Sequence, residues 1–370
     1  MPLGRRQRVA TVGAAAVATA LSLAACSSSS SSSTAASSGS SSAASSASAS
    51  SGAKLSGTLN GSGSTFQTTF QEAAISAFKS VQPNMTVNYG SGGSGKGRSD
   101  LASGVVNYAG SDSPIPSAEM STFKGKTVLY FPVVIGPITM AYNLSGVSSL
   151  KLTPTVIADI FQAKITNWDN SAIASINPGV KLPSEPITLA VRSDSSGTTQ
   201  NFTLFVDDAV PSVWKLGSSS TIKWPAAARG GSGNGGVASI IKSTPGAIGY
   251  VDYADAKASG LTFASVQNKS GAYIAPSPTS ASAAAAGVTP AANLTFAAAW
   301  APGASAYPIT YQSWDLVYES QPNANDAALL KAYIGYLIGA GQALLPGLGY
   351  APLPASLDAS AKAQLSKIGM

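Results

Sequence analysis

Residues 192–198 place an arginine, an aspartate and several hydroxyl and glycine residues within seven positions, Arg-Ser-Asp-Ser-Ser-Gly-Thr. The apolar, alternating residues 187–191 precede them, and residues 199–206 contain apolar side chains at helical spacing, so the sequence predicts a strand, a tight loop and a helix start. A helix start offers unpaired backbone N–H groups and the positive end of the helix dipole. The segment therefore predicts a site for a phosphate-like anion.

Two earlier loops have similar chemistry: residues 61–66, Gly-Ser-Gly-Ser-Thr-Phe, and residues 90–97, Gly-Ser-Gly-Gly-Ser-Gly-Lys-Gly. Each is expected between a strand and a helix, and a further strand over residues 105–111 leads to Asp112. Glycine lets several backbone N–H groups converge on one anion. The order of strands and helices predicts an α/β fold, with the binding site at the carboxyl ends of the strands.

Four further segments position these loops. Residues 127–143 are strongly apolar but contain Pro132 and Pro137, so we expect two strands there. Residues 226–236 predict a glycine-rich loop before a helix over 237–242, and residues 271–305, rich in Ala, Ser and Pro, predict a mobile excursion. The longest helix is expected over residues 327–344.

The amino terminus has the pattern of an exported lipoprotein. Three arginines, at positions 5, 6 and 8, precede an uncharged apolar stretch that ends in Leu-Ala-Ala-Cys at residues 23–26, which resembles the bacterial lipobox. We expect residues 1–25 to be a signal peptide and Cys26 to be lipidated; an ordinary signal peptide is the alternative. Residues 27–52 contain 17 serines, so residues 26–54 predict a flexible tether.

The composition excludes several classes of function. The chain has no histidine and one cysteine, so a histidine-based triad, an internal disulfide and a zinc site are not expected. Without the three arginines near the amino terminus, 19 basic residues face 16 acidic ones, a net charge of about +3. This weak charge, without a basic cluster, does not predict nucleic-acid binding. We expect no metal and no cofactor.

Two enzymatic or nucleotide-binding interpretations remain as weaker alternatives. Residues 90–97 approach a nucleotide-binding P-loop, but Gly97 stands where the Mg²⁺-binding hydroxyl is needed. Residues 239–242, Ser-Ile-Ile-Lys, match the S-x-x-K motif of penicillin-binding enzymes, but the S-D-N-like residues 111–113 come before it, in the wrong order, and lack the asparagine.

Four ordered motifs resemble those of the PstS family, the phosphate-binding proteins of bacterial phosphate ABC transporters. They are residues 61–66, 87–95, 108–114 and 192–198. The resemblance extends from about residue 57 to the carboxyl terminus and is weakest over 260–305. It implies a periplasmic-binding-protein-like (type II) fold of two α/β lobes with the ligand between them. Residues 55–135 with 306–370 would form lobe 1, and residues 136–305 lobe 2.

The resemblance also implies a function: binding of inorganic phosphate outside the cytoplasmic membrane and its delivery to the membrane subunits of a phosphate ABC permease, without catalysis. The implied location is extracytoplasmic, with a lipid anchor in the cell membrane. An extracellular phosphatase using the same pocket, or a surface adhesin, are the alternatives. The lack of histidine and of metal-ligand clusters disfavours the phosphatase.

Carried over motif by motif, the implied phosphate ligands are Thr65, Phe66, Ser94, Asp112, Arg192, Ser196, Gly197 and Thr198, with Asp194 holding the guanidinium of Arg192. The chain departs from the commonest family pattern at Gln67, Lys96 and Ser195, and Lys96 is expected to face either the anion or the solvent.

Asp112 is suited to phosphate because phosphate near neutral pH carries at least one proton, which a carboxylate can accept. Sulfate has no such proton. In a closed site, a sulfate oxygen and the carboxylate of Asp112 would face each other as two unpaired acceptors, which would cost about 1–3 kcal/mol or more. Arg192 can present two parallel donors to the anion.

Overall fold

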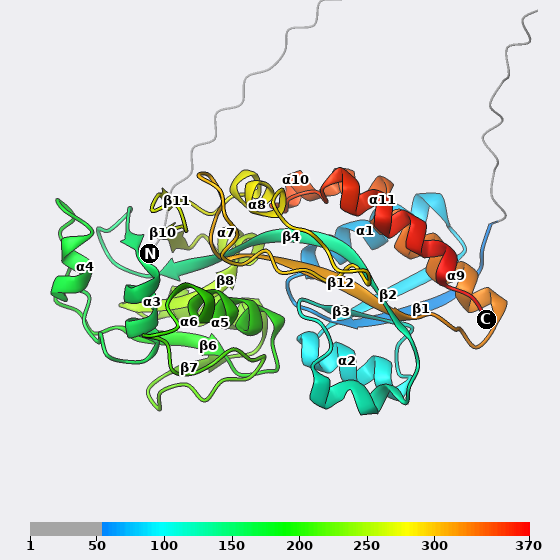
Figure 1. The fold of residues 1–370 in the computed structure, drawn as a ribbon, viewed down its shortest axis with the longest axis horizontal. Coiled ribbons are helices and arrows are strands. Elements are labelled where there is room, and N and C mark those ends of the chain that lie inside the picture. The colour runs from blue at the N-terminus through cyan, green and yellow to red at the C-terminus, as the bar shows by residue number, and fades with distance from the viewer. Residues whose placement is uncertain (1–53) are drawn as a thin grey trace, which may run out of the picture. The chain divides into compact units, whose positions relative to one another are not determined.

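Two long strands, β4 (Val128–Tyr142) and β12 (Thr310–Tyr318), lie side by side in the middle of the main sheet (Figure 1). The computed structural model describes residues 54–370, and within them this sheet has nine strands. Their order is β2-β1-β3-β12-β4-β8-β6-β7, with β9 also paired to β4. The bounds are β1 (Gly57–Gly63), β2 (Met85–Ser91), β3 (Tyr108–Ser111), β6 (Thr188–Arg192), β7 (Arg229–Gly231), β8 (Ala247–Asp252) and β9 (Thr262–Phe263).

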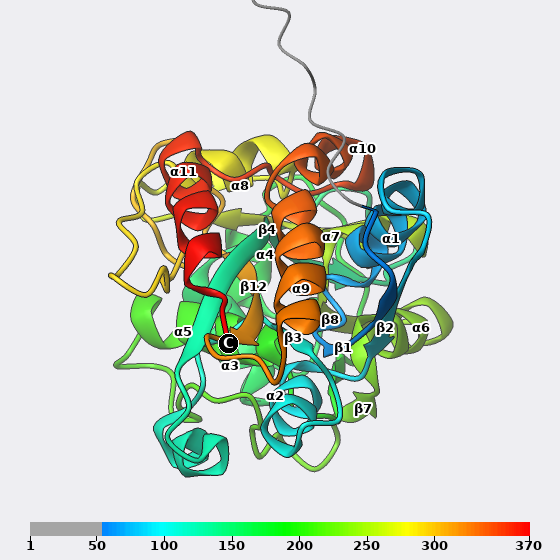
Figure 2. The same cartoon turned by 90° about the vertical axis from the view of Figure 1, so that its right-hand side faces the viewer.

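A second, three-stranded sheet joins β5 (Lys151–Leu152), β10 (Ser265–Gln267) and β11 (Tyr273–Ile274). Around β1, β2 and β3, helices α1 (Thr68–Val81) and α9 (Ala324–Leu337) lie on one side and α2 (Ser94–Ser103) on the other (Figures 1 and 2). Near β6 and β8 lie α3 (Pro154–Phe161), α5 (Gly197–Ala209) and α6 (Gly233–Ser243). The remaining helices are η1 (Ser117–Phe123), α4 (Ser171–Ser175), α7 (Tyr253–Ala258), α8 (Pro278–Ala285), η2 (Ala340–Leu344), α10 (Leu345–Leu348), α11 (Ala355–Gln364) and η3 (Leu365–Lys367).

The predicted succession of strand, glycine loop and helix is confirmed. Helix α1 buries Phe70, Ala74 and Phe78 on one face, whereas Val81, the last residue of the helix, is 53% exposed. Strand β1 pairs in parallel with both β2 and β3. The carboxyl ends of these three strands therefore meet at one edge of the sheet, as the α/β prediction requires.

The prediction of two strands over residues 127–143 is wrong, because β4 is continuous. Pro132 pairs with Trp314 and Val134 with Ser313, so Val133 is an extra residue at a bulge, where a proline is tolerated. Pro137 faces Thr310, at the first residue of β12, and pairing with β8 begins at the next position of β4. Both prolines thus lie where the regular ladder is interrupted.

Three other local predictions need correction. The segment 226–236 contains strand β7, and α6 begins at Gly233, before residue 237. Residues 271–305 contain β11 and α8, which packs on β4 and has a capping box between Ser277 and Ser280. Alanine side chains are small enough for close packing, so this segment buries Ala281, Ala284 and Ala285 despite its lack of large apolar residues.

The helix predicted over 327–344 ends at Leu337, and η2 follows from Ala340, because Gly339 interrupts the regular helix. Within residues 54–370, the stretch Ala324–Leu348 is long and apolar enough to cross a membrane by composition. In this fold α9 instead buries Leu330, Tyr333 and Leu337 in the core.

Strands β1, β2, β3 and β12 lie on one side of β4, and β8, β6 and β7 on the other. This order is compatible with two lobes joined by β4 and β12, but the lobe boundaries given above stay a prediction. The predicted signal peptide (1–25), the predicted lipidation site Cys26 and the predicted tether (26–54) lie outside the described residues, except for residue 54.

Asp315 of β12 is a buried acid in this core. Burial raises the pKa of Asp315 to about 7, although hydrogen bonds from Gln71 and Gln67 act in the opposite direction. A raised folded-state pKa means that the contribution of this group to stability is full below pH about 4 and is lost as the pH rises through about 7. The loss amounts to about 4 kcal/mol at pH 8 if the group ionises without relaxation of its surroundings.

We therefore expect Asp315→Asn to remove this part of the pH dependence. In thermal unfolding, the midpoint of the unsubstituted protein should fall more between pH 5 and pH 8 than that of the variant. Equal slopes for the two proteins would show that Asp315 does not carry the buried proton.

Candidate anion-binding site

The loops that follow β1, β2, β3 and β6 come together in the structure. The Gly95 N–H donates to the Ser195 carbonyl (3.1 Å), which joins the start of α2 to the loop after β6. The Asn201 side chain on α5 donates to the Asp112 carbonyl (2.6 Å). These contacts connect segments about 90 to 100 positions apart, so they bring the second, third and fourth predicted motifs together.

Asp112, at the end of β3, is buried and surrounded by hydroxyl donors. Its Oδ1 accepts hydrogen bonds from Ser64 Oγ and Ser313 Oγ, each at 2.5 Å, and Ser94 Oγ lies 3.3 Å from Oδ2. Burial raises the pKa of Asp112, while the hydrogen bonds of Ser313 and Ser64 and the charge of Arg192 act against this rise. The carboxyl is thus a buried acceptor whose ionised form is supported by its neighbours.

Arg192, the last residue of β6, is buried and ion-paired with Asp194. Its Nε donates to Asp194 Oδ1 (2.8 Å), its Nη2 contacts Asp194 Oδ2, and its Nη1 donates to Thr198 Oγ1 (3.3 Å). Burial acts to raise the pKa of Asp194, but the hydrogen bond and charge of Arg192 and the Gly233 N–H outweigh it and lower that pKa. Asp194 therefore holds the guanidinium as predicted, and Nη1 points toward the start of α5.

Helix α5 begins at this point. The Ser196 side chain is its N-cap and accepts from the Thr199 N–H (3.1 Å), which leaves the proton of this hydroxyl available to donate. Gly197 lies against the opposite wall: a Cβ at this position would be 2.5 Å from both Ser94 Oγ and Asp112 Cβ. Only glycine allows the α5 amides to approach Asp112 this closely.

Thr65 is joined to the start of α5 by Asn234, a residue that was not identified from the sequence. Asn234 Nδ2, on α6, lies 3.1 Å from Thr65 Oγ1 and 3.3 Å from Thr198 Oγ1. Oδ1 of the buried Asn234 has no hydrogen-bond partner among the described residues. Asn234 therefore joins the first and fourth motifs.

Phe66 contributes in a different way from Thr65. Its backbone N–H, predicted to contact the anion, donates to Ser64 Oγ at 3.1 Å. Its buried ring stacks on Tyr311 of β12 with 3.9 Å between ring centroids. In this structure the Phe66 amide thus acts on Ser64, which in turn contacts Asp112.

Lys96 faces the solvent. Its Nζ lies 2.6 Å from Asp100 Oδ2, one helical turn away, and its side chain is 57% exposed. Of the two predicted orientations of Lys96, the structure therefore shows the one toward the solvent.

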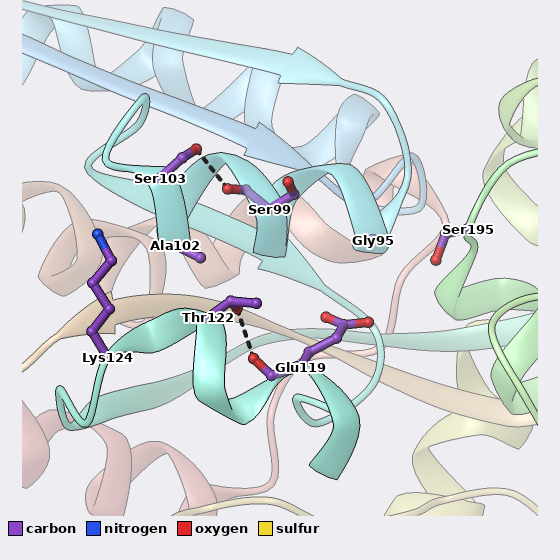
Figure 3. A pocket seen from close by; sticks show the side chains of 8 residues that line it. All are labelled: Gly95, Ser99, Ala102, Ser103, Glu119, Thr122, Lys124 and Ser195. Carbon is purple, nitrogen blue, oxygen red and sulfur yellow. Dashed lines mark hydrogen bonds between the residues drawn. The ribbon is translucent and has the colours of Figure 1, made fainter.

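A cavity of about 580 Å³ opens beside the site. It lies between α2 and η1, and Figure 3 shows Ser195, from the loop before α5, across from Gly95 at the start of α2. Among residues 54–370, no group of three or more His, Cys, Asp or Glu side chains is placed to hold a metal ion.

Four residues of this site were missed by the sequence analysis: Ser64, Asn234, Gln67 as a hydrogen-bonding residue, and Ser313. Ser64 lies inside the first glycine loop, so its position next to Thr65 was an available signal. Asn234 lies at the start of α6, inside the glycine-rich segment 226–236 that was predicted to precede a helix, so a signal was available there too. Ser313 lies on β12, in a segment without a recognisable anion-binding pattern.

Comparison with known proteins agrees with this geometry. Residues 48–340 match the PBP superfamily domain. The chain is 34% identical over 315 residues to phosphate-binding protein PstS 3 of Mycobacterium leprae, covering 81% of this chain and 84% of that protein. The chain belongs to the PstS family. A second PstS-family relative, phosphate-binding protein PstS of Pasteurella multocida, is 32% identical over 313 residues, covering 83% and 89% of the two chains.

Solved structures confirm the periplasmic-binding-protein-like fold. A periplasmic phosphate-binding protein, PfluDING, bound with phosphate, superposes with a TM-score of 0.71 at 22% identity, covering 83% of this chain and 94% of that one. A putative phosphate ABC transporter substrate-binding protein with bound phosphate from Clostridium perfringens gives a TM-score of 0.60 at 18% identity, covering 80% and 100%. The predicted family and fold are thus confirmed, whereas the ligand residues stay predictions.

Proposed function

We propose that this PstS-family protein binds inorganic phosphate outside the cytoplasmic membrane and delivers it to a phosphate ABC permease. The observation that carries the proposal is the meeting of Arg192, the start of α5 and the acceptor Asp112 in one buried site. A cation and helix amides favour an anion, and a carboxylate beside them favours an anion that still carries a proton.

The ligands proposed are the predicted ones, assisted by Asn234, except that Phe66 contributes indirectly because its N–H donates to Ser64 Oγ. The Thr198 hydroxyl lies next to Arg192 Nη1, Asn234 joins it to the Thr65 hydroxyl, and the Ser94 hydroxyl lies beside Asp112. Ser196 would act through its hydroxyl proton, since its Oγ accepts from the Thr199 N–H and its own N–H donates to the Ser220 carbonyl (2.9 Å). Thr65 and Arg192 belong to the two different predicted lobes, so binding would hold the lobes closed.

Titration calorimetry with phosphate and sulfate tests this function. We expect phosphate to bind tightly and to raise the midpoint of thermal unfolding, because a ligand that binds only the folded chain stabilises it. Sulfate should bind far more weakly. No heat and no shift in the midpoint with phosphate would refute the proposed function.

We also propose that Cys26 is the lipidated residue that anchors the protein to the cell membrane, with the serine-rich segment as a tether. The support is the sequence Leu-Ala-Ala-Cys after a basic and apolar segment. In cells, Cys26→Ser should move the protein from the membrane fraction to the soluble or secreted fraction, because the acyl chains are lost. A variant that stays with the membrane through detergent-free washing would contradict the anchor.

The family relatives named above are binding proteins, which favours transport over the alternative of an extracellular phosphatase. A chromogenic phosphate ester incubated with the purified protein separates the two functions. We expect no release of the chromophore above the uncatalysed rate.

A further inference from the structure

The side chains behind Asp112 form a directed chain of hydrogen bonds. A serine hydroxyl has a single proton to donate. Ser313 Oγ accepts from Gln67 Nε2 (2.7 Å), and Ser64 Oγ accepts from the Phe66 N–H (3.1 Å). Because a donor already points at each hydroxyl oxygen, each hydroxyl proton is directed to the remaining neighbour, Oδ1 of Asp112.

The orientation of the Gln67 amide is fixed by its other neighbours. Its Nε2 also lies 3.0 Å from the Trp314 carbonyl, which can only accept, so this atom must be the nitrogen. Its Oε1 accepts from Gln71 Nε2 (2.9 Å), and Gln71 Oε1 accepts from the Tyr333 hydroxyl (2.7 Å). Gln67 and Gln71 are fully buried, so water does not compete for these bonds.

The other oxygen of Asp112 faces the ligand side. A Cβ placed on Gly197, at the start of α5, would lie 2.6 Å from Asp112 Oδ2. Oδ1 is occupied by two directed donors, whereas Oδ2 receives only the longer hydrogen bond from Ser94 Oγ (3.3 Å), which itself accepts from the Asp112 N–H. One acceptor position of Oδ2 is therefore left for a proton. The two oxygens of Asp112 therefore have different roles.

We propose that Gln67 is a positioning residue for anion selection: acting through Ser313, it keeps Oδ1 of Asp112 occupied, so that Oδ2 accepts the proton of the bound anion. This inference rests on the proposed binding of phosphate. Sulfate has no proton for Oδ2, so weakening the chain behind Asp112 should reduce the preference for phosphate over sulfate.

The pH dependence of phosphate binding depends on the same series of hydrogen bonds behind Asp112. Serine hydroxyls act on Asp112 as hydrogen-bond donors. The titratable groups that act on it are Arg192 of β6, Tyr89 of β2, Tyr311 of β12 and Tyr350. Burial raises the pKa of each of these tyrosines, so they stay neutral and Arg192 is the cation among them. Loss of the Ser313 hydrogen bond should raise the pKa of Asp112 further, so that phosphate affinity begins to fall at a higher pH as the solution is acidified.

The test is calorimetry with phosphate and with sulfate between pH 5 and pH 8.5. The proteins are the unsubstituted chain, Gln67→Met, Ser313→Ala and the double variant. Gln364→Met is the matched control. Gln364 is a buried glutamine that donates to the Tyr130 carbonyl (2.8 Å), and it takes no part in the hydrogen bonds behind Asp112. We expect each single variant to lower the ratio of phosphate to sulfate affinity about tenfold, as for the loss of a hydrogen bond to a charged group.

The double variant distinguishes a relay from two separate effects. If Gln67 acts through Ser313, the double variant should have the same ratio and pH profile as Ser313→Ala, and the control should match the unsubstituted protein. Additive losses, or a Gln67→Met ratio equal to that of the control, would overturn the inference. If Gln67→Met does not fold, an unchanged ratio and pH profile in Ser313→Ala overturns it equally. Failure of the unsubstituted protein to bind phosphate would instead refute the proposed function.

Discussion

Replacing Arg192 with alanine should weaken phosphate binding by about two to three and a half powers of ten. The guanidinium is buried, held by Asp194, and directs Nη1 toward the start of α5. Its removal takes away charge-assisted donors and leaves the half-buried Asp194 without its partner, a loss of about 3–5 kcal/mol. Calorimetry at pH 8 measures the change.

Arg229→Ala is the matched control for this variant. Arg229 lies on the adjacent strand β7, is exposed, and donates to Thr244 Oγ1 (3.2 Å). The Arg229→Ala substitution changes the net charge by the same amount as Arg192→Ala. It should leave the phosphate affinity within about twofold, because an exposed arginine contributes little to a distant site. Equal losses in the two variants would mean that Arg192 acts only through the overall charge of the protein.

Asp112→Asn should lower the affinity for phosphate and raise that for sulfate. The two serines behind Asp112 donate to one of its oxygens, so the oxygen of the introduced amide would occupy that side and its NH₂ group would face the anion. The site then loses its acceptor for the phosphate proton and gains a donor for sulfate. We expect the ratio of affinities to fall by about two powers of ten, from about 1–3 kcal/mol of altered pairing for each anion.

The pH profile adds a second readout to this variant. Because burial raises the pKa of Asp112, protonation of this group should weaken phosphate binding as the pH falls in the unsubstituted protein. The asparagine variant lacks this titration and should show only that of phosphate itself. Asp169→Asn, at an exposed position, is the control for removal of one negative charge. If sulfate binding stays undetectable in Asp112→Asn, the role given to Asp112 is wrong.

Much of the site could be predicted because its motifs are local. The first helices follow glycine- and serine-rich loops directly after strands, and Ser196 and Gly197 begin α5 where the sequence indicates a helix start. Parallel pairing of β1 with β2 and β3 then brings the ends of these strands to one edge. Residues at strand ends were accordingly identified, whereas their roles as ligands still await the binding experiments.

Two of the missed residues, Ser313 and Gln67, depend on long-range pairing. Ser313 contacts Asp112 across 201 positions because β12 lies between β3 and β4, an order that no short segment encodes. Gln67 meets Ser313 across 246 positions for the same reason. Residues 271–305 were misjudged on different grounds: the buried face of α8 consists mainly of alanine, which gives a weak apolar signal in the sequence.

A crystal structure of the protein grown with phosphate tests the central claim most directly. The account predicts one phosphate ion enclosed at the start of α5, with Arg192 Nη1, Thr65 Oγ1 and Asp112 Oδ2 all within hydrogen-bond distance of its oxygens. Asp112 Oδ1 should keep its contacts with Ser64 and Ser313. Phosphate bound elsewhere, or bound here with Asp112 turned away from it, would contradict the account.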